Sequence, residues 1–413
     1  MSNHTISKCR VSGNKNLVKI LSLGQQALTG IFPKDKSVAV ESGPLDLLWC
    51  PESGLVQLAN SYSKEAMYGE NYGYRSGLNM SMVRHLHSKI KILEKQYQLK
   101  IGDVVLDIGS NDGTTLKGYS TVGLKKIGID PTSAKFRKYY DSDVTIVEDF
   151  FSPANFKSTG AGNANLVTSI AMFYDLESPI DFAKNVEEIL APDGIWHFEQ
   201  SYLPLMLRND AYDTVCHEHI SYYSLSVVKR ILDAANLRII DVGTNDINGG
   251  SFAVTASKKS SKWKSNDAVI NWMIDREQTL GLHTPKPYRE FEERAFQHKK
   301  DLKDLLRSLV SSGKTVIGYG ASTKGNVILQ FCGITAEEIP AIAEVNPDKF
   351  GCVTPGTNIP IISEAEAKER YKPDYFLVLP WHFRENIISR EREFLDQGGK
   401  LIFPLPNIEI VSV

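Results

Sequence analysis

Gly102-Asp-Val-Val-Leu-Asp-Ile-Gly-Ser-Asn-Asp-Gly-Thr-Thr-Leu116 is the stretch that decides the fold of this chain. Its apolar run, Val104 to Ile108, predicts a buried strand, and the turn from Gly109 to Gly113 predicts the opening of a helix, because glycine adopts the backbone angles that such a turn needs. A second apolar run ends at Asp130, about 20 residues further on, where nucleoside-binding α/β units place a carboxylate on the ribose hydroxyls.

The spacing Asp107-x-Gly109-x-x-x-Gly113 distinguishes between two classes of ligand. It lacks the third close-packed glycine that a dinucleotide pyrophosphate needs, yet it keeps an acidic residue at the strand end. This favours S-adenosylmethionine (SAM) over NAD. The alternative interpretation is that any doubly wound fold has a glycine-rich first turn.

Length, charge and cysteine content exclude several classes of protein. A chain of 413 residues is too long for one hydrophobic core and predicts two or three domains. Its net charge is −2 with both signs interspersed, so we expect no nucleic-acid partner. We also expect no membrane association, because no apolar run reaches the ~20 residues of a membrane span and the N-terminus lacks a signal pattern. Five scattered cysteines favour the reducing cytoplasm, and both monomer and dimer remain open.

Two similar knuckles lie near the N-terminus, Cys9-Arg-Val-Ser12-Gly and Cys50-Pro-Glu-Ser53-Gly. A pair of Cys-x-x-Cys knuckles would bind zinc, because tetrahedral Zn²⁺ prefers four such ligands. Here serine occupies the second position of each pair, and a serine hydroxyl does not replace a thiolate. We therefore predict that the knuckle fold is kept and that zinc is absent. The alternative is a weak two-thiolate site, completed by a ligand that the sequence does not show.

A central α/β unit follows an aromatic, glycine-rich segment. Strands are expected at Val144–Val147, Leu166–Ile170 and Gly194–Gln200, with an amphipathic helix from Pro179 to Leu190. Strand and helix alternate, so the sheet is mostly parallel and ligands should bind at the C-terminal ends of its strands. The third strand ends near Asp149, where such folds contact adenine. The predicted SAM-binding residues are Tyr72, Tyr74, Asp107, Gly109, Asn111, Asp112, Gly113, Asp130, Asp149, Phe150, Ser169 and Met172.

The residues best suited to chemistry lie just past the fifth strand, in Tyr212-Asp-Thr-Val-Cys-His-Glu-His-Ile-Ser-Tyr-Tyr223. His217, Glu218 and His219 are adjacent there, and Tyr222 follows. Histidine titrates near neutral pH and is suited to removing a proton from carbon. A His-x-His pair can also bind a metal, but no third ligand at a suggestive spacing accompanies this pair, so we expect no metal.

With these motifs in order, the sequence resembles the nucleotide-sugar C-methyltransferase family, which methylates C-3 of 4-keto-deoxyhexoses. The resemblance covers essentially the whole chain. It is carried by both knuckles, Asn71-Tyr-Gly-Tyr-Arg-Ser-Gly77, the Asp107 loop, Met172-Phe-Tyr-Asp-Leu176, Glu199-Gln-Ser-Tyr202, Cys216-His-Glu-His219, Asn248-Gly-Gly-Ser251 and Gly318-Tyr-Gly-Ala-Ser-Thr-Lys324.

The resemblance implies a SAM-dependent enzyme in which the residue matching His219 acts as the base. Glu218 and the neighbouring tyrosines would lie around the substrate, and a donor such as His217, Tyr222 or Tyr223 would hold the enolate that forms. Two departures from the family pattern stand out: the zinc cysteines are halved, and Cys216 occupies a position where the resemblance leads us to expect tyrosine. Because of the second departure, the sequence does not identify the sugar or the group that stabilises the developing oxyanion.

The C-terminal part repeats the α/β pattern. Thr315 to Lys324 reads as strand, glycine loop and helix, and a second strand ends at Glu344. Such a unit could hold NAD, but Thr323 replaces the third glycine and Lys324 suits a phosphate charge. We predict that this unit binds the nucleotide of the sugar donor; a degenerate copy that only packs is the alternative. The predicted substrate-binding residues are Glu199, Tyr202, Asn248, Gly249, Ser322, Lys324, His382 and Arg384.

Together these patterns predict an α/β protein with a class I, Rossmann-like SAM methyltransferase domain at its centre. The predicted layout is a knuckle domain (1–78), the SAM-binding domain (79–257), a helical connector (258–311) and a Rossmann-like C-terminal domain (312–413). In the connector, Trp263, Trp272, Met273, Leu280 and Phe291 are the expected buried positions. The expected activity is SAM-dependent methylation of C-3 of a nucleotide-linked 4-keto-deoxysugar. The alternatives are an NAD-dependent oxidoreductase of nucleotide sugars, a methyltransferase of a non-sugar small molecule, and a non-catalytic SAM-binding partner.

Overall fold

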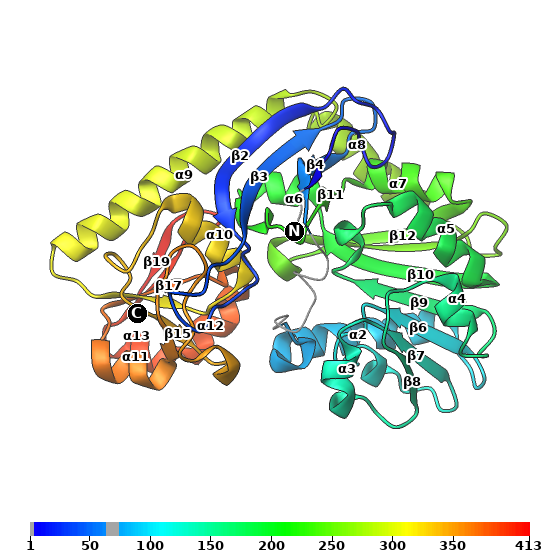
Figure 1. The fold of residues 1–413 in the computed structure, drawn as a ribbon. Helices are drawn as coiled ribbons and strands as arrows, with labels where there is room; N and C mark the ends of the chain where they lie inside the picture. Colours follow the sequence, from blue (N-terminus) through cyan, green and yellow to red (C-terminus); the bar gives the residue numbers. More distant parts are fainter. Residues whose placement is uncertain (1–3, 63–73) are drawn as a thin grey trace.

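A computed structural model describes residues 4–62 and 74–413 (Figure 1). Its central part contains a seven-stranded mixed sheet in the order β12-β13-β10-β9-β6-β7-β8. Five neighbouring strands are parallel, and β13 runs antiparallel to both β10 and β12. The strands are β6 (Val104–Ile108), β7 (Lys125–Ile129), β8 (Val144–Val147), β9 (Ala164–Ile170), β10 (Leu190–Ser201), β12 (Leu237–Asn245) and β13 (Ser251–Lys258). This confirms the predicted Rossmann-like methyltransferase fold.

Helices cover both faces of this sheet. Asn79 caps the first of them, because its side chain accepts a hydrogen bond from the backbone N–H of Ser81. The apolar positions of that helix, Leu86, Ile90 and Leu93, are buried on one face. The helices are α2 (Met80–Tyr97), α3 (Ser133–Phe136), α4 (Pro153–Lys157), α5 (Pro179–Ile189), α6 (Leu203–Arg208), α7 (Leu225–Ala234) and α8 (Asp267–Thr279).

The N-terminal sheet contains a strand from far along the chain. Its order is β11-β4-β3-β2, all antiparallel. The strands are β2 (Val18–Ala27), β3 (Ser42–Trp49), β4 (Val56–Leu58) and β11 (Ser221–Tyr222), and a separate pair joins β1 (His4–Thr5) to β5 (Asn60–Ser61). Since β11 begins two residues after His219, the N-terminal sheet holds the segment that carries the predicted base.

The C-terminal part forms its own sheet in the order β16-β15-β14-β17-β18-β19, parallel except for β19. The strands are β14 (Val316–Tyr319), β15 (Ile342–Glu344), β16 (Ile361–Ser363), β17 (Tyr375–Val378), β18 (Lys400–Phe403) and β19 (Glu409–Val411). The helices are α10 (Thr323–Cys332), α11 (Glu364–Tyr371), α12 (Arg384–Arg390) and α13 (Arg392–Asp396). The long helix α9 (Lys286–Ser311) leads into this sheet and lies along the outside of the molecule (Figure 1).

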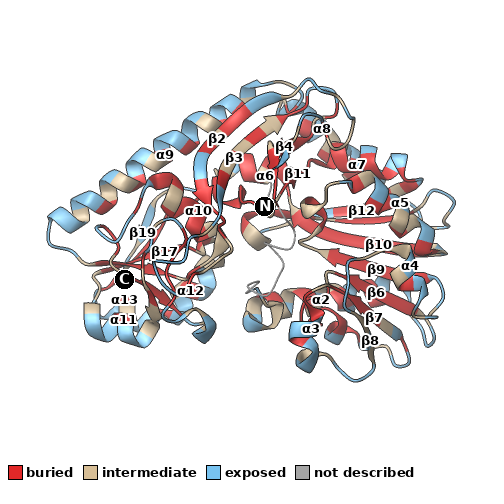
Figure 2. Ribbon diagram, in the orientation of Figure 1, coloured by how far each residue is buried: buried red, intermediate tan, exposed pale blue. Residues whose placement is uncertain are grey.

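The N-terminal and C-terminal sheets share a hydrophobic core, because Leu21 and Leu47 belong to the same buried cluster as Ile317 and Phe376. Figure 2 shows most of the central strands buried and the outer face of α9 exposed. The domain boundaries predicted from sequence stay a prediction, and this buried cluster contains residues of all four predicted units.

In the predicted connector, Met273 and Phe291 are buried and Trp263 is partly buried. Trp272 and Leu280 are exposed, so the prediction that they are buried was wrong. Trp272 precedes Met273 on α8, and neighbouring helix positions point about 100° apart, so burying one leaves the other toward solvent. Among the described residues, no helix combines the length and the apolar character that crossing a membrane requires.

Candidate active site

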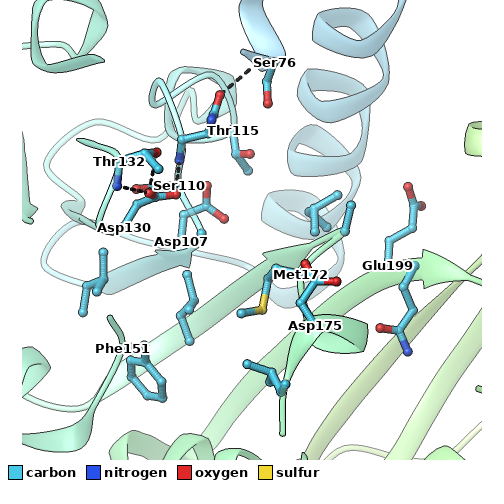
Figure 3. A pocket seen from close by; sticks show the side chains of 18 of the residues that line it. Ser76, Asp107, Ser110, Thr115, Asp130, Thr132, Phe151, Met172, Asp175 and Glu199 are labelled. Atoms are coloured by element: carbon cyan, nitrogen blue, oxygen red, sulfur yellow. Dashed lines mark hydrogen bonds between the residues drawn. The ribbon is translucent and has the colours of Figure 1, made fainter. Parts of the chain in front are cut away.

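A cavity of about 400 Å³ lies at the C-terminal ends of β6, β7, β9 and β10 (Figure 3). This is the sheet edge at which the sequence predicted a ligand. The predicted SAM-binding residues that line it are Tyr74, Asp107, Gly109, Asn111, Asp130, Phe150 and Met172.

The loop after β6 is held by the carboxylate that ends β7. The backbone N–H of Asn111 donates to one oxygen of Asp130 at 2.9 Å, and that of Thr132 donates to the other at 2.6 Å. Gly109 has a φ of +74°, and a Cβ there would lie 3.3 Å from Cγ of Met172. A side chain at this position would therefore strain the backbone and crowd the cavity wall.

Asp107 places a carboxyl group with an unusual pKa in the cavity wall. Burial raises its pKa to about 7, despite the hydrogen bond that the Thr168 hydroxyl donates at 2.6 Å, which lowers it. Near neutral pH this group can therefore be either a neutral acid or a carboxylate. A ligand with a positive charge would favour the carboxylate.

Glu199 also lines the cavity, but its carboxylate is bound to the protein. It contacts Nε2 of His85 at 2.6 Å, Nζ of Lys89 at 2.8 Å and the amide of Asn245 at 2.7 Å. Burial alone would raise its pKa, but the hydrogen bond with His85 and the charge of Lys89 lower it to about 2. Glu199 therefore joins α2 to β10 as a stable anion at the edge of the cavity.

His219 is not among the residues that line the cavity, but its ring has a defined orientation. Its Nδ1 contacts the carbonyl oxygen of Thr214 at 2.9 Å, so Nδ1 carries the proton and Nε2 carries the lone pair. The ring packs on Tyr174, with the centroids 4.2 Å apart, and the neighbours of Tyr174 in the chain include the cavity residues Met172 and Asp175. Burial, together with the charge of Lys324, lowers the pKa of His219 to about 3, so the imidazole is neutral at physiological pH.

The other predicted catalytic residues have different surroundings. His217 is buried edge-on to Tyr62, with centroids 4.7 Å apart, and burial lowers its pKa to about 4. The hydroxyl of Tyr222 contacts the carbonyl of Thr214 at 3.4 Å inside the core. Glu218 lies next to Gly30, where an added Cβ would collide with its Oε1, and burial raises the pKa of Glu218 and favours the neutral acid.

Lys324 connects the C-terminal sheet to this region. Its Nζ donates to the carbonyl of Asn248 at 2.6 Å, and its charge acts on both His219 and His382. Burial lowers the pKa of Lys324, whereas the nearby Asp213 raises it. The predicted residues Asn248, Lys324, His382 and Gly249 therefore lie in one region. Gly249 packs against the indole of Trp381, which donates to Asp213 at 2.7 Å.

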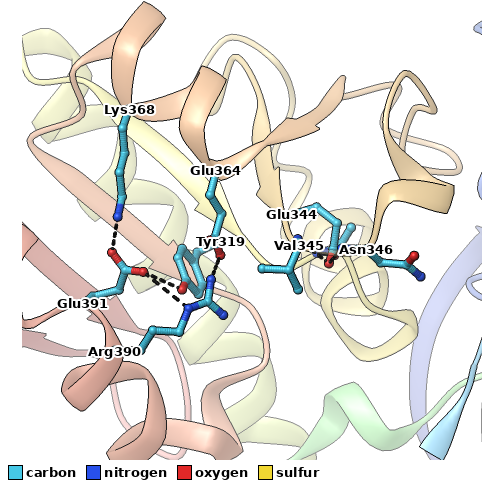
Figure 4. Close-up of polar contacts among 9 residues, drawn as sticks. Tyr319, Glu344, Val345, Asn346, Glu364, Lys368, Arg390 and Glu391 are labelled. Atoms are coloured by element: carbon cyan, nitrogen blue, oxygen red, sulfur yellow. Dashed lines mark hydrogen bonds and ion pairs between the residues drawn. The ribbon is translucent and has the colours of Figure 1, made fainter. Parts of the chain in front are cut away.

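The loop after β14 repeats the arrangement around Asp130. Glu344 ends β15, and its carboxylate accepts hydrogen bonds from the backbone N–H groups of Ala321 at 2.7 Å, Val345 at 2.7 Å and Asn346 at 2.9 Å (Figure 4). Nearby, Tyr319 donates to Glu391 at 2.8 Å. In both the central and the C-terminal α/β units, the second strand thus ends in a carboxylate that accepts a hydrogen bond from the glycine loop after the first strand.

Several predicted SAM-binding residues bond to the protein instead of lining the cavity. Asp112 accepts from the N–H of Gly77 at 3.0 Å, Asp149 accepts from Asn155 at 3.0 Å, and the hydroxyl of Ser169 accepts from Trp196 at 2.9 Å. At Gly113 an added Cβ would meet the ring of Tyr140 at 2.8 Å. Tyr72 lies outside the described residues.

Three predicted substrate residues also have other partners. The hydroxyl of Tyr202 donates to Glu277 at 2.7 Å within the core. Ser322 caps α10 by accepting from the N–H of Gly325 at 3.0 Å. Arg384 binds Glu409 and Glu385 at the surface, at 2.6 and 2.8 Å.

Sequence reasoning missed Asp213, Tyr174 and Thr214 as residues around His219. Asp213 and Thr214 lie within the quoted His-Glu-His stretch, and Tyr174 lies within Met172–Leu176. The sequence indicated both motifs, but no role was assigned to these three residues.

The two knuckles meet as the sequence predicted. Sγ of Cys9 lies 3.1 Å from Oγ of Ser53, and Oγ of Ser12 lies 3.5 Å from Sγ of Cys50. Burial alone would raise the pKa of Cys50, but hydrogen bonds from Ser53 and Ser12 lower it. Within residues 4–62 and 74–413, no group of three or more His, Cys, Asp or Glu side chains is placed to hold a metal ion.

Comparison with known proteins gives the family. Family models match a zinc binding domain at residues 9–68, a methyltransferase domain at residues 82–242 and a C-methyltransferase C-terminal domain at residues 246–406. C-methyltransferase NovU of Streptomyces niveus is 32% identical over 98% of this chain and 97% of its own length. The chain belongs to the C-methyltransferase family.

Solved structures of methyltransferases match part of the chain. The plantazolicin methyltransferase BpumL, solved with a desmethylPZN analog and SAH, is 12% identical, with a TM-score of 0.36 over 45% of this chain and 88% of its own. A SAM-dependent methyltransferase from Clostridium acetobutylicum is 13% identical, with a TM-score of 0.33 over 43% of this chain and 92% of its own.

The cavity of this SAM-dependent C-methyltransferase fits its cofactor. Gly109 leaves room for a ligand at the point where a Cβ would approach Met172. Asp130 lines the cavity where a ribose needs an acceptor, and Asp107 supplies a carboxyl group suited to a cationic ligand.

We predict that SAM affinity increases as the pH rises through about 7, because Asp107 must lose its proton to attract the positive charge of SAM. Titration calorimetry at pH 6 and pH 8 should show tighter binding at the higher pH. In Asp107→Asn this difference should disappear and binding should be weak at both values. The same pH dependence in the variant would assign it to another group.

Proposed function

We propose that this C-methyltransferase transfers a methyl group to C-3 of a nucleotide-linked 4-keto-deoxysugar, with His219 as the base. The observation that carries the proposal is the tautomer of His219. Nδ1 is committed to Thr214, and Nε2 makes no hydrogen bond with any of the described residues, so its lone pair is available to accept a proton. The resemblance of the whole chain to nucleotide-sugar C-methyltransferases supports the choice of substrate.

The ketone at C-4 acidifies the hydrogen on C-3, and Nε2 of His219 removes it as a proton. SAM, when bound, would supply an electrophilic methyl group to the C-3 carbanion, and the broken sulfur–methyl bond would leave S-adenosylhomocysteine. Holding the two carbon centres in line supplies much of the rate enhancement. The pKa of about 3 keeps His219 unprotonated but makes it a weak base. Burial is the larger cause of this low pKa, and a diphosphate next to Lys324 would counter only the second cause, the charge of that lysine, which would make the base stronger when substrate is bound.

The enolate oxygen needs a hydrogen-bond donor. Glu218 suits this role because burial favours its neutral form, and Oε2 of Glu218 is buried with no hydrogen-bond partner among the described residues. Both ring nitrogens of His217 are also buried without a hydrogen-bond partner among the described residues, but this ring packs edge-on against Tyr62, and Tyr222 contacts Thr214, so Glu218 is the donor that we propose.

The region around Lys324 suits the diphosphate of the substrate. Lys324 is the second residue of α10, and helix N-termini favour anions. Asn248, Gly249 and His382 would lie along the sugar and nucleotide. In this region the C-terminal unit lies close to His219. A nucleotide sugar that contacts both the C-terminal unit and His219 would require this arrangement.

Two measurements test this function. A panel of TDP-, GDP- and CDP-linked 4-keto-deoxysugars is incubated with labelled SAM, and methyl incorporation at C-3 is followed. In parallel, exchange of the C-3 hydrogen with D₂O is measured by NMR without SAM, since proton removal does not need the methyl group. Methylation of one panel member with exchange at C-3 is expected. Methylation at oxygen, or of non-sugar ketones only, would contradict the proposal.

A further inference from the structure

Arg10, in the first knuckle, reaches across to the segment that carries His219. Its side chain is 3% exposed. The guanidinium donates to the carbonyl oxygens of Leu58 and Ile220, both at 3.2 Å, and to the hydroxyl of Ser61 at 2.8 Å. It also donates to the carboxylate of Glu177 at 3.2 Å. One buried side chain therefore binds the N-terminal sheet, the residue after His219 and a residue that lines the cavity.

The contact with Ile220 fixes the direction of the His219 backbone. The N–H of Ile220 donates to the carbonyl of Tyr174 at 3.1 Å, and its carbonyl accepts from both Leu58 N–H at 3.0 Å and Arg10. Tyr174 is also the residue on which the ring of His219 packs. The backbone next to His219 is thus bound on one side to the cavity wall and on the other to the knuckle.

The knuckle in turn holds Arg10 in place. The backbone N–H of Arg10 donates to the side chain of Gln57 at 2.9 Å, and Gln57 donates to the carbonyl of Lys8 at 3.2 Å. Gln57 lies on β4 directly opposite Ser221 of β11. The contact between Cys9 and Ser53 joins the first knuckle, which contains Arg10, to the second knuckle. Knuckle, β4 and β11 therefore form one hydrogen-bonded unit with Arg10 at its centre.

We infer that Arg10 is a positioning residue for methyl transfer, which holds His219 against the cavity wall by binding Ile220 and Glu177 together. The inference rests on the proposed role of His219. It gives the knuckle a function that depends on its arginine and not on a metal ion. Because guanidinium donates several hydrogen bonds in a fixed plane, lysine can replace only part of this role.

The test compares Arg10→Met and Arg10→Lys with Arg238→Met. Arg238 is a matched control: its guanidinium also donates to the backbone, at 3.1 Å to the carbonyl of Ser261, and to the hydroxyl of Ser265 at 2.6 Å, away from the cavity. We expect kcat of Arg10→Met to fall about 100-fold, the loss that a displacement of about 1 Å can cause. C-3 exchange should fall in parallel, whereas SAM affinity and KM for the sugar change little. Arg10→Lys should lie between Arg10→Met and the native protein.

The outcomes separate this inference from the proposed function. Equal kcat in Arg10→Met and Arg238→Met would overturn the positioning role while leaving His219 as the base. A loss confined to SAM affinity, or to thermal stability with kcat intact, would also overturn it. If Arg10→Met does not fold, Arg10→Lys decides the question, and native kcat in that variant counts against the inference. Undiminished C-3 exchange in His219→Asn would instead contradict the proposed function, whatever Arg10 does.

Discussion

Replacing His219 with asparagine is expected to lower turnover by about 10³-fold, within the range that general bases contribute. The amide nitrogen of asparagine can still donate to the carbonyl of Thr214, as Nδ1 does at 2.9 Å, so the substitution removes the Nε2 base and keeps that contact. Exchange of the C-3 hydrogen with D₂O should be lost to the same extent, because this step needs only the base. SAM affinity, measured by calorimetry, should change little, since His219 is not a lining residue of the SAM cavity.

His197→Asn provides the control. His197 is also a buried histidine whose pKa is lowered to about 3 by burial, and its Nδ1 contacts the hydroxyl of Thr255 at 2.9 Å. Its loss tests whether removing any buried neutral imidazole lowers turnover. Near-native turnover and exchange in His219→Asn would remove His219 from its role, and equal losses in both variants would point to folding instead.

Local sequence patterns predicted the fold and the SAM side of the site because they act over short distances. Short continuous apolar runs indicated the strands of the central sheet, and period-3.6 runs indicated the helices, near their observed bounds. The short loop from Gly109 to Gly113 and the acid at Asp130 were found because each requires a specific residue type at a fixed spacing. The turn expected before Gly194 is an irregularity inside β10, since pairing with β9 extends the strand to Leu190.

Contacts between distant parts of the chain could not be predicted in this way. Arg10 and Ile220 are 210 positions apart, and Lys324 and Asn248 are 76 apart, so no local pattern joins them. Polar residues at strand ends were assigned to ligands, yet Tyr202 bonds to Glu277 across 75 positions. A single sequence shows that a polar group needs a partner, but the tertiary fold decides whether that partner is a ligand or another side chain.

Lys324→Met should have two separate effects. The buried ammonium group of Lys324 is placed to bind phosphate, and its charge also lowers the pKa of His219. KM for the nucleotide sugar should rise about 10- to 100-fold, the value of a hydrogen bond to a charged group. The second effect is on pH dependence. A nearby cation disfavours the imidazolium, so removing it raises the pKa of His219 from about 3, although burial, the larger cause, keeps it below the ordinary value.

The sign of this second effect can be measured from kcat/KM for the sugar at saturating SAM. In the native protein the acid limb that reports His219 should lie below pH 5, so protonation of the base causes no loss between pH 8 and pH 5. In Lys324→Met that limb should move to higher pH. Lys349→Met is the matched control, since Lys349 is a second buried lysine of the C-terminal unit, donates to the carbonyl of Ala321 at 2.7 Å and is not among the groups that shift the pKa of His219. If KM rises while the acid limb stays in place, Lys324 binds substrate but does not shift the pKa of His219. If KM is unchanged, the diphosphate binds in another part of the cleft.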